Sequence, residues 1–335
     1  MNITIKYLII GLFCLFAGGL RAQNSYTNPV LNHDMPDPTV IQTKEGEFYL
    51  YATENHGYSI PIAHSSDLVN WEIVGAAFTR ETRPSFEPKG GLWAPDINYL
   101  KGKYLLYYSM SYWGGNETCG IGVATADSPQ GPFRDHGALF RSNEIGVTNS
   151  IDPEFVREKG RNYLIWGSFW GIYAVELSSD GLSVKPGCTP KQIAGRAFEA
   201  SYIHKRNGFY YLFASIGSCC EGLNSTYTTV VGRSRNLLGP YTDKSGKRML
   251  DNACEIVMKR SDRFVGPGHN SDIITDKAGD DWLLYHAVDA RNPRGRKLPL
   301  DNIRWVDDRP TVQAANPPEP PPPTPRSSFP TPNKL

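Results

Sequence analysis

NSIDPEFVREKGRNYLIWGSFW, residues 149–170, determines the fold prediction for this chain. It contains an acidic residue beside a proline (Asp152), a short apolar run, a charged turn with a glycine, and a second run rich in aromatic and β-branched residues. This order is typical of a β-hairpin. A single hairpin does not explain why an acidic residue stands at its start. Recurrence of the whole unit along the chain would explain it.

The unit recurs over most of the chain. Its copies begin at Asp37, Ala94, Asp152, Glu199 and His269, and each continues into an aromatic strand that ends in small residues. In the fifth copy this strand is expected over residues 281–287. Their spacing of about 47 to 70 residues is within or above the range for four-stranded propeller blades. The sequence therefore predicts an all-β fold, a five-bladed β-propeller. Inner strands are expected to start near Asp37, Asp96, Asp152, Glu199 and Asn270.

Third strands rich in small and β-branched residues follow several hairpins, at residues 60–71, 120–129 and 229–237. One blade cannot bury both of its faces, whereas radial stacking of five blades buries a continuous apolar core. Two segments are candidates for the strand that closes the ring, Asn302–Val306 and the residues before Asp37. The sequence leaves this choice open.

Both ends of the chain differ from the repeats. Residues 1–22 are typical of a secretory signal peptide, with Lys6, an apolar stretch from Tyr7 to Leu20, and the small residue Ala22 at the cleavage point. Residues 313–335 are rich in proline and predict an extended, disordered tail. The propeller domain is thus expected over residues 27–312, in a secreted or periplasmic protein.

Composition excludes some classes of partner. The 335 residues carry 35 basic and 34 acidic side chains, intermixed, for a formal net charge of +1. Because no basic stripe is available to neutralise phosphates, nucleic acid is not expected to bind. We also expect no membrane association after signal cleavage, and a monomer.

Cysteine usage adds one candidate for redox chemistry. Export permits disulfides, but an odd number of cysteines remains after signal cleavage, so at least one thiol lacks a partner within the chain. The sequence does not determine the pairing, and the adjacent Cys219 and Cys220 are the one redox candidate. The remaining cysteines are expected to be small buried hydrophobes: Cys119, Cys188 and Cys254.

Aromatic side chains fall into two sets. Tyr58, Trp93, Tyr112, Trp113, Phe169 and Trp170 lie at strand ends or in glycine-rich loops, where aromatic rings can stack on sugars. Packing between blades is the alternative, and it is the expectation for the mid-strand set: Tyr49, Tyr107, Trp166, Phe213 and Tyr285.

Three carboxylates converge in the predicted fold. The first strand of every blade lines the central channel, so Asp37, Asp152 and Glu199 meet although they are far apart in sequence. Asp before Pro is also a common way to start a turn, but Glu followed by Ala is not. Glycoside hydrolysis needs two carboxyl groups with separated pKa values, and a third nearby carboxylate raises the pKa of the acid.

At these residues the chain resembles glycoside hydrolase family 43, and within it the endo-acting arabinanases. The matching segments fall in order across residues 27–312: DPTV at 37–40, WAPDI at 93–97, NSIDP at 149–153, EASYIHKR at 199–206, SCC at 218–220 and GPGH at 266–269. The resemblance implies a five-bladed propeller that hydrolyses α-1,5-L-arabinan of plant pectic polysaccharide internally, with inversion at the anomeric carbon.

The resemblance also implies a role for each matching residue. Asp37 corresponds to the general base, Glu199 to the general acid, and Asp152 to the carboxylate that modulates the pKa of Glu199 and orients it. His269 corresponds to a channel histidine beside a hydrated, structural calcium ion, although a lone histidine at a strand start is more often a core residue. The expected substrate contacts are Asp37, Trp93, Gly114, Asn149, Ser150, Ile151, Asp152, Ser168, Phe169 and Trp170.

Two positions depart from the family pattern, and two other functions remain open. Ser201 stands where many relatives carry proline, and Arg309–Val312 runs into the proline-rich tail where relatives complete their last strand. The same carboxylates also suit an exo-acting α-L-arabinofuranosidase or β-xylosidase. A carbohydrate-binding propeller without turnover is the alternative from another class, and the three carboxylates argue against it.

Overall fold

A computed structural model of the protein describes residues 26–312. These residues form an all-β structure, which confirms the fold class predicted from the hairpin repeats. The few helical elements are α1 (Ser142–Ile145), η1 (Gly222–Asn224) and η2 (Met249–Asp251). Between residues 26 and 312 no helix is long and apolar enough to cross a membrane. The predicted signal peptide and proline-rich tail lie outside the described residues.

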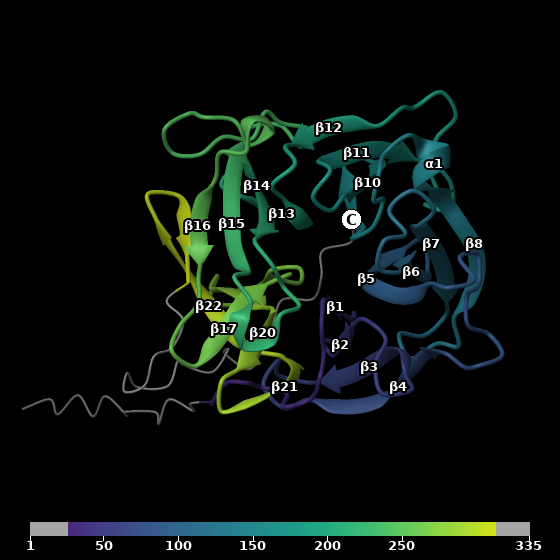
Figure 1. Ribbon diagram of the computed structural model, residues 1–335, viewed down its shortest axis with the longest axis horizontal. Helices are drawn as coiled ribbons and strands as arrows, with labels where there is room; N and C mark the ends of the chain where they lie inside the picture. The colour runs from purple at the N-terminus through teal and green to yellow at the C-terminus, as the bar shows by residue number, and fades with distance from the viewer. Residues whose placement is uncertain (1–25, 313–335) are drawn as a thin grey trace, which may run out of the picture.

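Most strands belong to five four-stranded antiparallel sheets, which follow one another around the molecule in Figure 1. The first two sheets contain β1 (Thr39–Gln42), β2 (Phe48–Tyr51), β3 (Ser59–Ser65), β4 (Glu72–Phe78), then β5 (Gly91–Leu100), β6 (Lys103–Ser111), β7 (Gly120–Ala126) and β8 (Arg134–Arg141). The next two contain β9 (Glu154–Glu158), β10 (Arg161–Trp166), β11 (Ile172–Leu177), β12 (Lys191–Ala194), then β13 (Glu199–Arg206), β14 (Phe209–Ile216), β15 (Thr228–Ser234) and β16 (Glu255–Met258). The fifth contains β18 (Ile274–Thr275), β19 (Asp281–Leu284), β22 (Leu300–Val306) and β23 (Arg309–Thr311).

Two-residue turns set the register of the inner hairpins. In the β9–β10 hairpin, Lys159 and Gly160 have φ of 52° and 75°. Positive φ at both central residues is the geometry of a type I′ turn, whose twist matches that of the strands it joins. The turns at 101–102 and 207–208 also have two positive φ values. These Lys-Gly and Asn-Gly turns therefore place the first two strands of three sheets.

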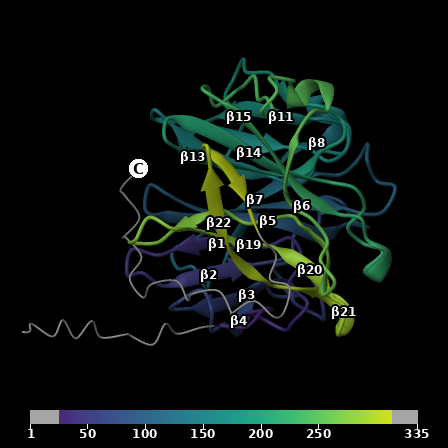
Figure 2. The same cartoon turned by 90° about the vertical axis from the view of Figure 1, so that its left-hand side faces the viewer.

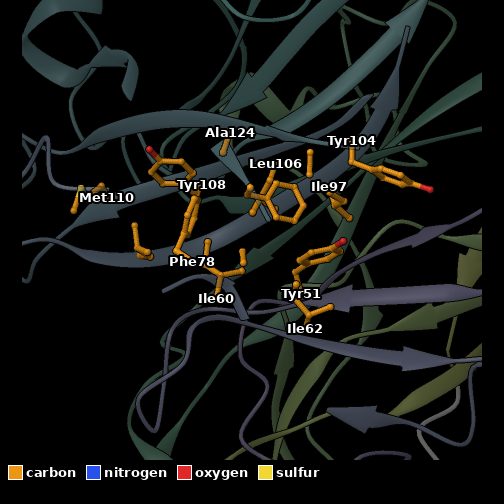
Figure 3. Close-up of a cluster of buried hydrophobic side chains, with 14 residues drawn as sticks. Tyr51, Ile60, Ile62, Phe78, Ile97, Tyr104, Leu106, Tyr108, Met110 and Ala124 are labelled. Atoms are coloured by element: carbon orange, nitrogen blue, oxygen red, sulfur yellow. The ribbon is translucent and has the colours of Figure 1, made fainter. Parts of the chain in front are cut away.

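Five clusters of buried apolar side chains lie between neighbouring four-stranded sheets. In one of them Tyr51 and Ile60 of the first sheet pack against Leu106 and Tyr108 of the second (Figure 3). Similar clusters join the second, third, fourth and fifth sheets in order. The last cluster packs Trp282 of the fifth sheet against the first, where Figure 2 shows β19 and β22 beside β1 and β2. Each four-stranded sheet thus packs against two others.

The mid-strand aromatic residues lie in these clusters, as predicted. Tyr107, Trp166, Phe213 and Tyr285 are fully buried, and Tyr49 is partly buried against the cluster between the first two sheets. Burial of such large apolar surfaces is the main favourable contribution to folding.

A sixth sheet departs from the predicted repeat. It has three strands, β17 (Phe264–Gly268), β20 (His286–Asp289) and β21 (Asn292–Lys297). The sequence predicted residues 281–287 as one strand, whereas β19 ends at Leu284 and the chain leaves the fifth sheet before it returns in β22. The reason is that β20 pairs with β17 on one side and with β21 on the other, so its backbone groups are satisfied outside the fifth sheet.

Both candidates for the last strand contribute to the fifth sheet. Strand β22 pairs with β23, so the segment that was expected to run into the tail forms an edge strand. Residues 26–35 bond to residues 296–300, at and before the start of β22. The side-chain amide of Asn28 donates to Leu300 O and accepts from Leu300 N, both at 2.9 Å, and the Val30 N–H donates to Leu298 O at 2.9 Å.

Candidate active site

Five residues near the starts of the inner strands share an unusual backbone conformation. Asp37, Ala94, Asp152, Ala200 and His269 all have φ between 38° and 59°. Residues other than glycine rarely adopt this left-handed region, and strain of about 1–3 kcal/mol persists there only where the surroundings enforce it. Asp37 and Asp152 occupy the repeated point, as predicted. The prediction for Glu199 was wrong by one residue, because Ala200 takes that backbone position.

Each of these five backbone N–H groups has a partner from a neighbouring element. Three donate to hydroxyl oxygens at the ends of second strands: Ala94 to Thr53 at 2.8 Å, Asp152 to Ser109 at 2.8 Å, and His269 to Ser215 at 2.9 Å. The Ala200 N–H instead donates to Asp152 Oδ2 at 3.2 Å. This bond ties the carboxylate of Asp152 to the residue directly after Glu199.

The strand starts open into a cleft of about 570 Å³. The structure places these predicted site residues on its lining: Asp37, Trp93, Trp113, Gly114, Asn149, Ile151, Asp152, Ser168, Phe169, Trp170, Glu199 and His269. Ser150 does not line the cleft. Its hydroxyl is buried, donates to Val147 O and accepts from Trp166 Nε1, because the side chain faces the apolar cluster below the loop.

Asp37 lies among hydrogen-bond donors that favour its ionised form. Oδ2 accepts from the Thr53 hydroxyl at 2.6 Å. Oδ1 lies 2.8 Å from Arg296 Nη1 and 3.2 Å from His269 Nδ1. Burial opposes ionisation, but the charges of Arg296 and His269 outweigh it and hold the pKa of Asp37 well below its usual range. Asp37 is therefore a carboxylate at neutral pH.

The two histidines beside Asp37 have opposite protonation tendencies. His286 Nδ1 lies 3.1 Å from both the backbone N and the Oδ1 of Asp37. Burial and the charge of Arg296 lower the pKa of His286 to about 4. Burial also disfavours the charged form of His269, but the neighbouring Asp37 carboxylate raises its pKa. Of the two histidines, His269 is therefore the one whose protonated form Asp37 favours.

Asp152 and Glu199 form a coupled pair that retains a proton. Burial raises the pKa of Asp152 to about 7, and the negative charge of Glu199 adds to this rise. Burial also raises the pKa of Glu199, although hydrogen bonds from Tyr227 and from Ser168, at 2.7 Å to Oε2, favour its ionised form. Repulsion between the two carboxylates is mutual, so the pair loses its protons in two separate steps.

Tyr227 can reach Glu199 because the residue that faces the tyrosine ring, Gly268, has no side chain. A Cβ on Gly268 would lie 2.3 Å from Tyr227 Cδ1, closer than any such contact allows. The ring of Tyr227 also stacks on His286, with ring centroids 5.6 Å apart and an interplanar angle of 12°. The second glycine of the GPGH segment, Gly268, is thus explained by the tyrosine that bonds Glu199.

Exposed aromatic rings flank the cleft. Trp93 and Trp113 lie against each other, with centroids 5.7 Å apart, and 80% of Trp113 is exposed. Phe169 and Trp170 are also exposed, and the guanidinium of Arg196 lies 4.2 Å from the centroid of Trp170. Tyr58 is exposed but is not part of the cleft lining.

Sequence reasoning missed Arg296, His286, Thr53 and Tyr227. Arg296 and His286 belong to the unpredicted sixth sheet, which brings them to Asp37 from 259 and 249 positions away. The glycine and arginines of residues 291–297 would have indicated a charged hairpin. Thr53 lies at the end of an aromatic strand that the repeats did identify, whereas Tyr227 lies just before the third strand predicted over residues 229–237.

Carboxyl groups of unequal proton affinity in one cleft, beside exposed indole rings, are the arrangement that hydrolysis of a glycosidic bond requires. The sequence model of Glycosyl hydrolases family 43 matches residues 26–310, and the chain belongs to this family.

Similar proteins include both modes of arabinan cleavage. The chain is 38% identical to extracellular endo-α-(1→5)-L-arabinanase 1 of Bacillus subtilis, over 84% of this chain and 88% of the relative. It is 36% identical to the extracellular exo-α-(1→5)-L-arabinofuranosidase ArbA of Cellvibrio japonicus, over 81% and 84%. A solved structure of Cellvibrio cellulosa α-L-arabinanase complexed with arabinohexaose superposes with a TM-score of 0.76 and 33% identity, over 84% of this chain and 96% of that one.

Proposed function

We propose that this glycoside hydrolase cuts α-1,5-linked L-arabinan within the polysaccharide chain and inverts the anomeric centre. The observation that carries the proposal is the difference in proton affinity within one cleft: Asp37 is held ionised, whereas the Asp152–Glu199 pair retains a proton. The substrate class follows from the names of the relatives, of which one acts on arabinan internally and one is described with arabinohexaose.

In this mechanism Glu199 is the general acid and Asp37 the general base. Glu199 donates its proton to the glycosidic oxygen as the bond from that oxygen to the anomeric carbon breaks. Asp37 removes a proton from the water that attacks the anomeric carbon from the opposite face. Inversion requires about 6.5–9.5 Å between the two carboxyl groups, so that the water fits. Asp152 orients Glu199 through its bond to the Ala200 N–H and disfavours loss of the acid's proton.

We infer that the scaffold is a five-bladed propeller. Five four-stranded sheets and five clusters between them, each sheet packed against two others, support this arrangement within residues 26–312. Closure then relies on residues 26–35 together with β22 and β23. Export through removal of residues 1–22 is also proposed, since the Bacillus subtilis relative is named extracellular. N-terminal sequencing of the protein recovered from outside the cytoplasm tests the cleavage point.

Product sizing on debranched arabinan separates internal from terminal cleavage. Internal cleavage yields a ladder of oligosaccharides early in the reaction and a rapid fall in viscosity. Terminal cleavage releases one small product from the start while viscosity persists, and it would favour the exo-acting alternative that ArbA represents. Binding without any reducing sugar would favour the non-catalytic alternative.

Proton NMR of the first product tests the stereochemistry. The proposal expects β-configured arabinose from the α-linked substrate before mutarotation. An α-configured product requires a covalent intermediate with the second carboxylate as nucleophile, and it would remove the general-base role from Asp37.

A hydrated calcium ion beside His269 is a further part of the proposal. No group of three His, Cys, Asp or Glu side chains among the described residues is placed to hold an ion directly. Buried oxygens without partners, Glu154 Oε2 and Asn270 Oδ1, offer acceptors to an ion's water shell. These residues fit only an ion held largely by water, with His269 as its protein neighbour. Such an ion would supply fixed positive charge to the interior.

Chelation tests the calcium proposal. Protein treated with a chelator should lose melting temperature and activity, and added calcium should restore both while magnesium restores neither. Full activity and an unchanged melting temperature after chelation, with metal analysis showing no calcium, would contradict the proposal.

A further inference from the structure

Two adjacent cysteines form a disulfide on the lining of the cleft. Cys219 and Cys220 are bonded to each other in the loop between β14 and β15, and both line the cleft that holds the carboxylates. Cys219 is half-buried and Cys220 is exposed. The other described cysteines have free thiols: Cys119, Cys188 and Cys254.

Chain stability does not explain this disulfide. A cross-link stabilises mainly by restricting the unfolded chain, and the effect grows with the length of the loop it closes. Here the bonded residues are neighbours in sequence. The loop also has its own bonds: the Ser225 hydroxyl donates to Cys219 O at 3.1 Å, and the Tyr227 N–H donates to Ser218 O at 3.1 Å. The loop therefore has other restraints than the sulfur bond.

The disulfide does change the chemistry of the cleft surface. Two thiols are rotatable hydrogen-bond donors, whereas a disulfide has no donor and presents two polarisable sulfur atoms in a fixed position. Two other loops of the same cleft also present rigid apolar groups, the indole of Trp113 and the rings of Phe169 and Trp170. The C–H faces of a sugar ring are complementary to such surfaces, as they are to aromatic rings.

We propose that the Cys219–Cys220 disulfide is a contact surface for one sugar unit of the bound polysaccharide. The inference rests on the proposed function, since it assigns a further binding element to the same cleft. It predicts that the intact disulfide contributes to substrate affinity and leaves the chemical step unchanged. Glu199 should keep its hydrogen bond from Tyr227 when the disulfide is opened. Tyr227 is held independently, because it packs against Gly268 and His286 and bonds Ser215 as well as Glu199.

The test compares the oxidised protein, the reduced protein and a double variant. Cys219→Ala/Cys220→Ala removes both sulfur atoms. In the reduced wild type, a dithiol gives two electrons and two protons to the disulfide and itself becomes a cyclic disulfide, and thiol labelling with mass spectrometry confirms the opening. Both forms should show a KM for long arabino-oligosaccharides raised about fivefold, with kcat and the pH profile unchanged. Reductant should have no effect on the double variant.

Cys188→Ala is the matched control, because Cys188 is a half-buried free thiol outside the cleft lining. Its KM should equal that of the wild type and should still rise on reduction. An unchanged KM after confirmed opening of the disulfide would overturn the inference, as would a shifted pH profile, which would mean that the disulfide acts through Tyr227 and Glu199. If the oxidised wild type does not hydrolyse arabinan at all, the proposed function fails first and separately.

Discussion

Asp37 shows how single residues from distant segments define one protonation state. Its Oδ1 lies 2.8 Å from Arg296 Nη1 and 3.2 Å from His269 Nδ1, while Thr53 bonds the other oxygen. Charge and hydrogen bonds together outweigh a burial that would otherwise keep the carboxyl group protonated. The working range of the base therefore depends on residues that do not touch the reacting water in the proposed mechanism.

Removal of the acid and removal of the base should differ in their response to the leaving group. Glu199→Ala should lose about 10³-fold in kcat on arabinan, because the leaving oxygen needs a proton, and recover much of it on aryl arabinosides with good leaving groups. Asp37→Ala should stay inactive on both. Steady-state kinetics on the two substrates check this, and equal losses for Glu199→Ala on both would contradict its role as acid.

Loss of Arg296 should move the acid limb of the pH–rate profile to higher pH. Arg296→Met removes the nearest positive charge, so the pKa of the buried Asp37 rises and the base becomes protonated at a higher pH than in the wild type. The profile of kcat/KM for the free enzyme measures this shift. Arg294→Met, an exposed change in the same hairpin, should leave the limb in place. An unmoved limb in Arg296→Met would show that His269 alone sets the ionisation.

At the scale of elements, regular hairpins were predictable and inserted ones were not. The β9–β10 hairpin follows from two apolar runs on either side of a Lys-Gly turn, all of it local. The β20–β21 hairpin directly continues the β19 run, so nothing in residues 281–287 separates two strands that belong to different sheets. The residues that line the cleft could be predicted where they belong to the sequence repeats. Arg296 could not be predicted, because its partner Asp37 is 259 positions away.

Strand β22 carries a buried carboxyl group that should make stability depend on pH. Burial raises the pKa of Asp301 to about 7 from 3.8, although the Tyr285 hydroxyl donates to it at 2.6 Å. Below pH 3.8 both states are protonated. As pH rises towards 7 the unfolded state loses its proton first, so folding stability falls, by up to about 4 kcal/mol in total.

Asp301→Asn should therefore be more stable than the wild type at pH 8 and little different at pH 4. Its amide oxygen can still accept from Tyr285. Urea unfolding at the two pH values measures the difference. Asp67→Asn is the opposite control, because burial raises the pKa of Asp67 but hydrogen bonds from Asn70 and Val69 outweigh it and lower that pKa overall; that variant should lose stability at pH 8. An Asp301→Asn variant less stable than wild type at pH 8 would contradict the raised pKa.

At the scale of the whole molecule, the first and last described segments meet at the fifth sheet. Residues 26–35 bond to the backbone of residues 296–300, and the apolar cluster there contains side chains from both ends, including Tyr26 and Leu300. The sequence left ring closure open because neither segment has the hairpin pattern. Backbone hydrogen bonds between distant segments have no local sequence signature.

Asn28→Ala should destabilise the whole molecule by about 2 kcal/mol, because the change removes two hydrogen bonds to the buried backbone of Leu300. Urea unfolding monitored by tryptophan fluorescence, with activity followed in parallel, measures the loss. Thr27→Ala, at an exposed neighbouring position, should change stability by less than about 0.5 kcal/mol. Unfolding of Asn28→Ala at the wild-type urea midpoint would show that the segment is not required for closure.

The sixth sheet has a consequence for the newly made chain. A ribosome that has completed Asp37 must still add 259 residues before Arg296 exists to bind it. Until then, the site lacks the positive charge that holds the pKa of the buried Asp37 down, and the cleft lacks one of its walls. A chain that stops early, or is clipped inside β20–β21, would carry all three carboxylates and still lack an assembled active site. Hydrolytic activity would then serve as a sensitive assay for chains that have been finished and folded from end to end.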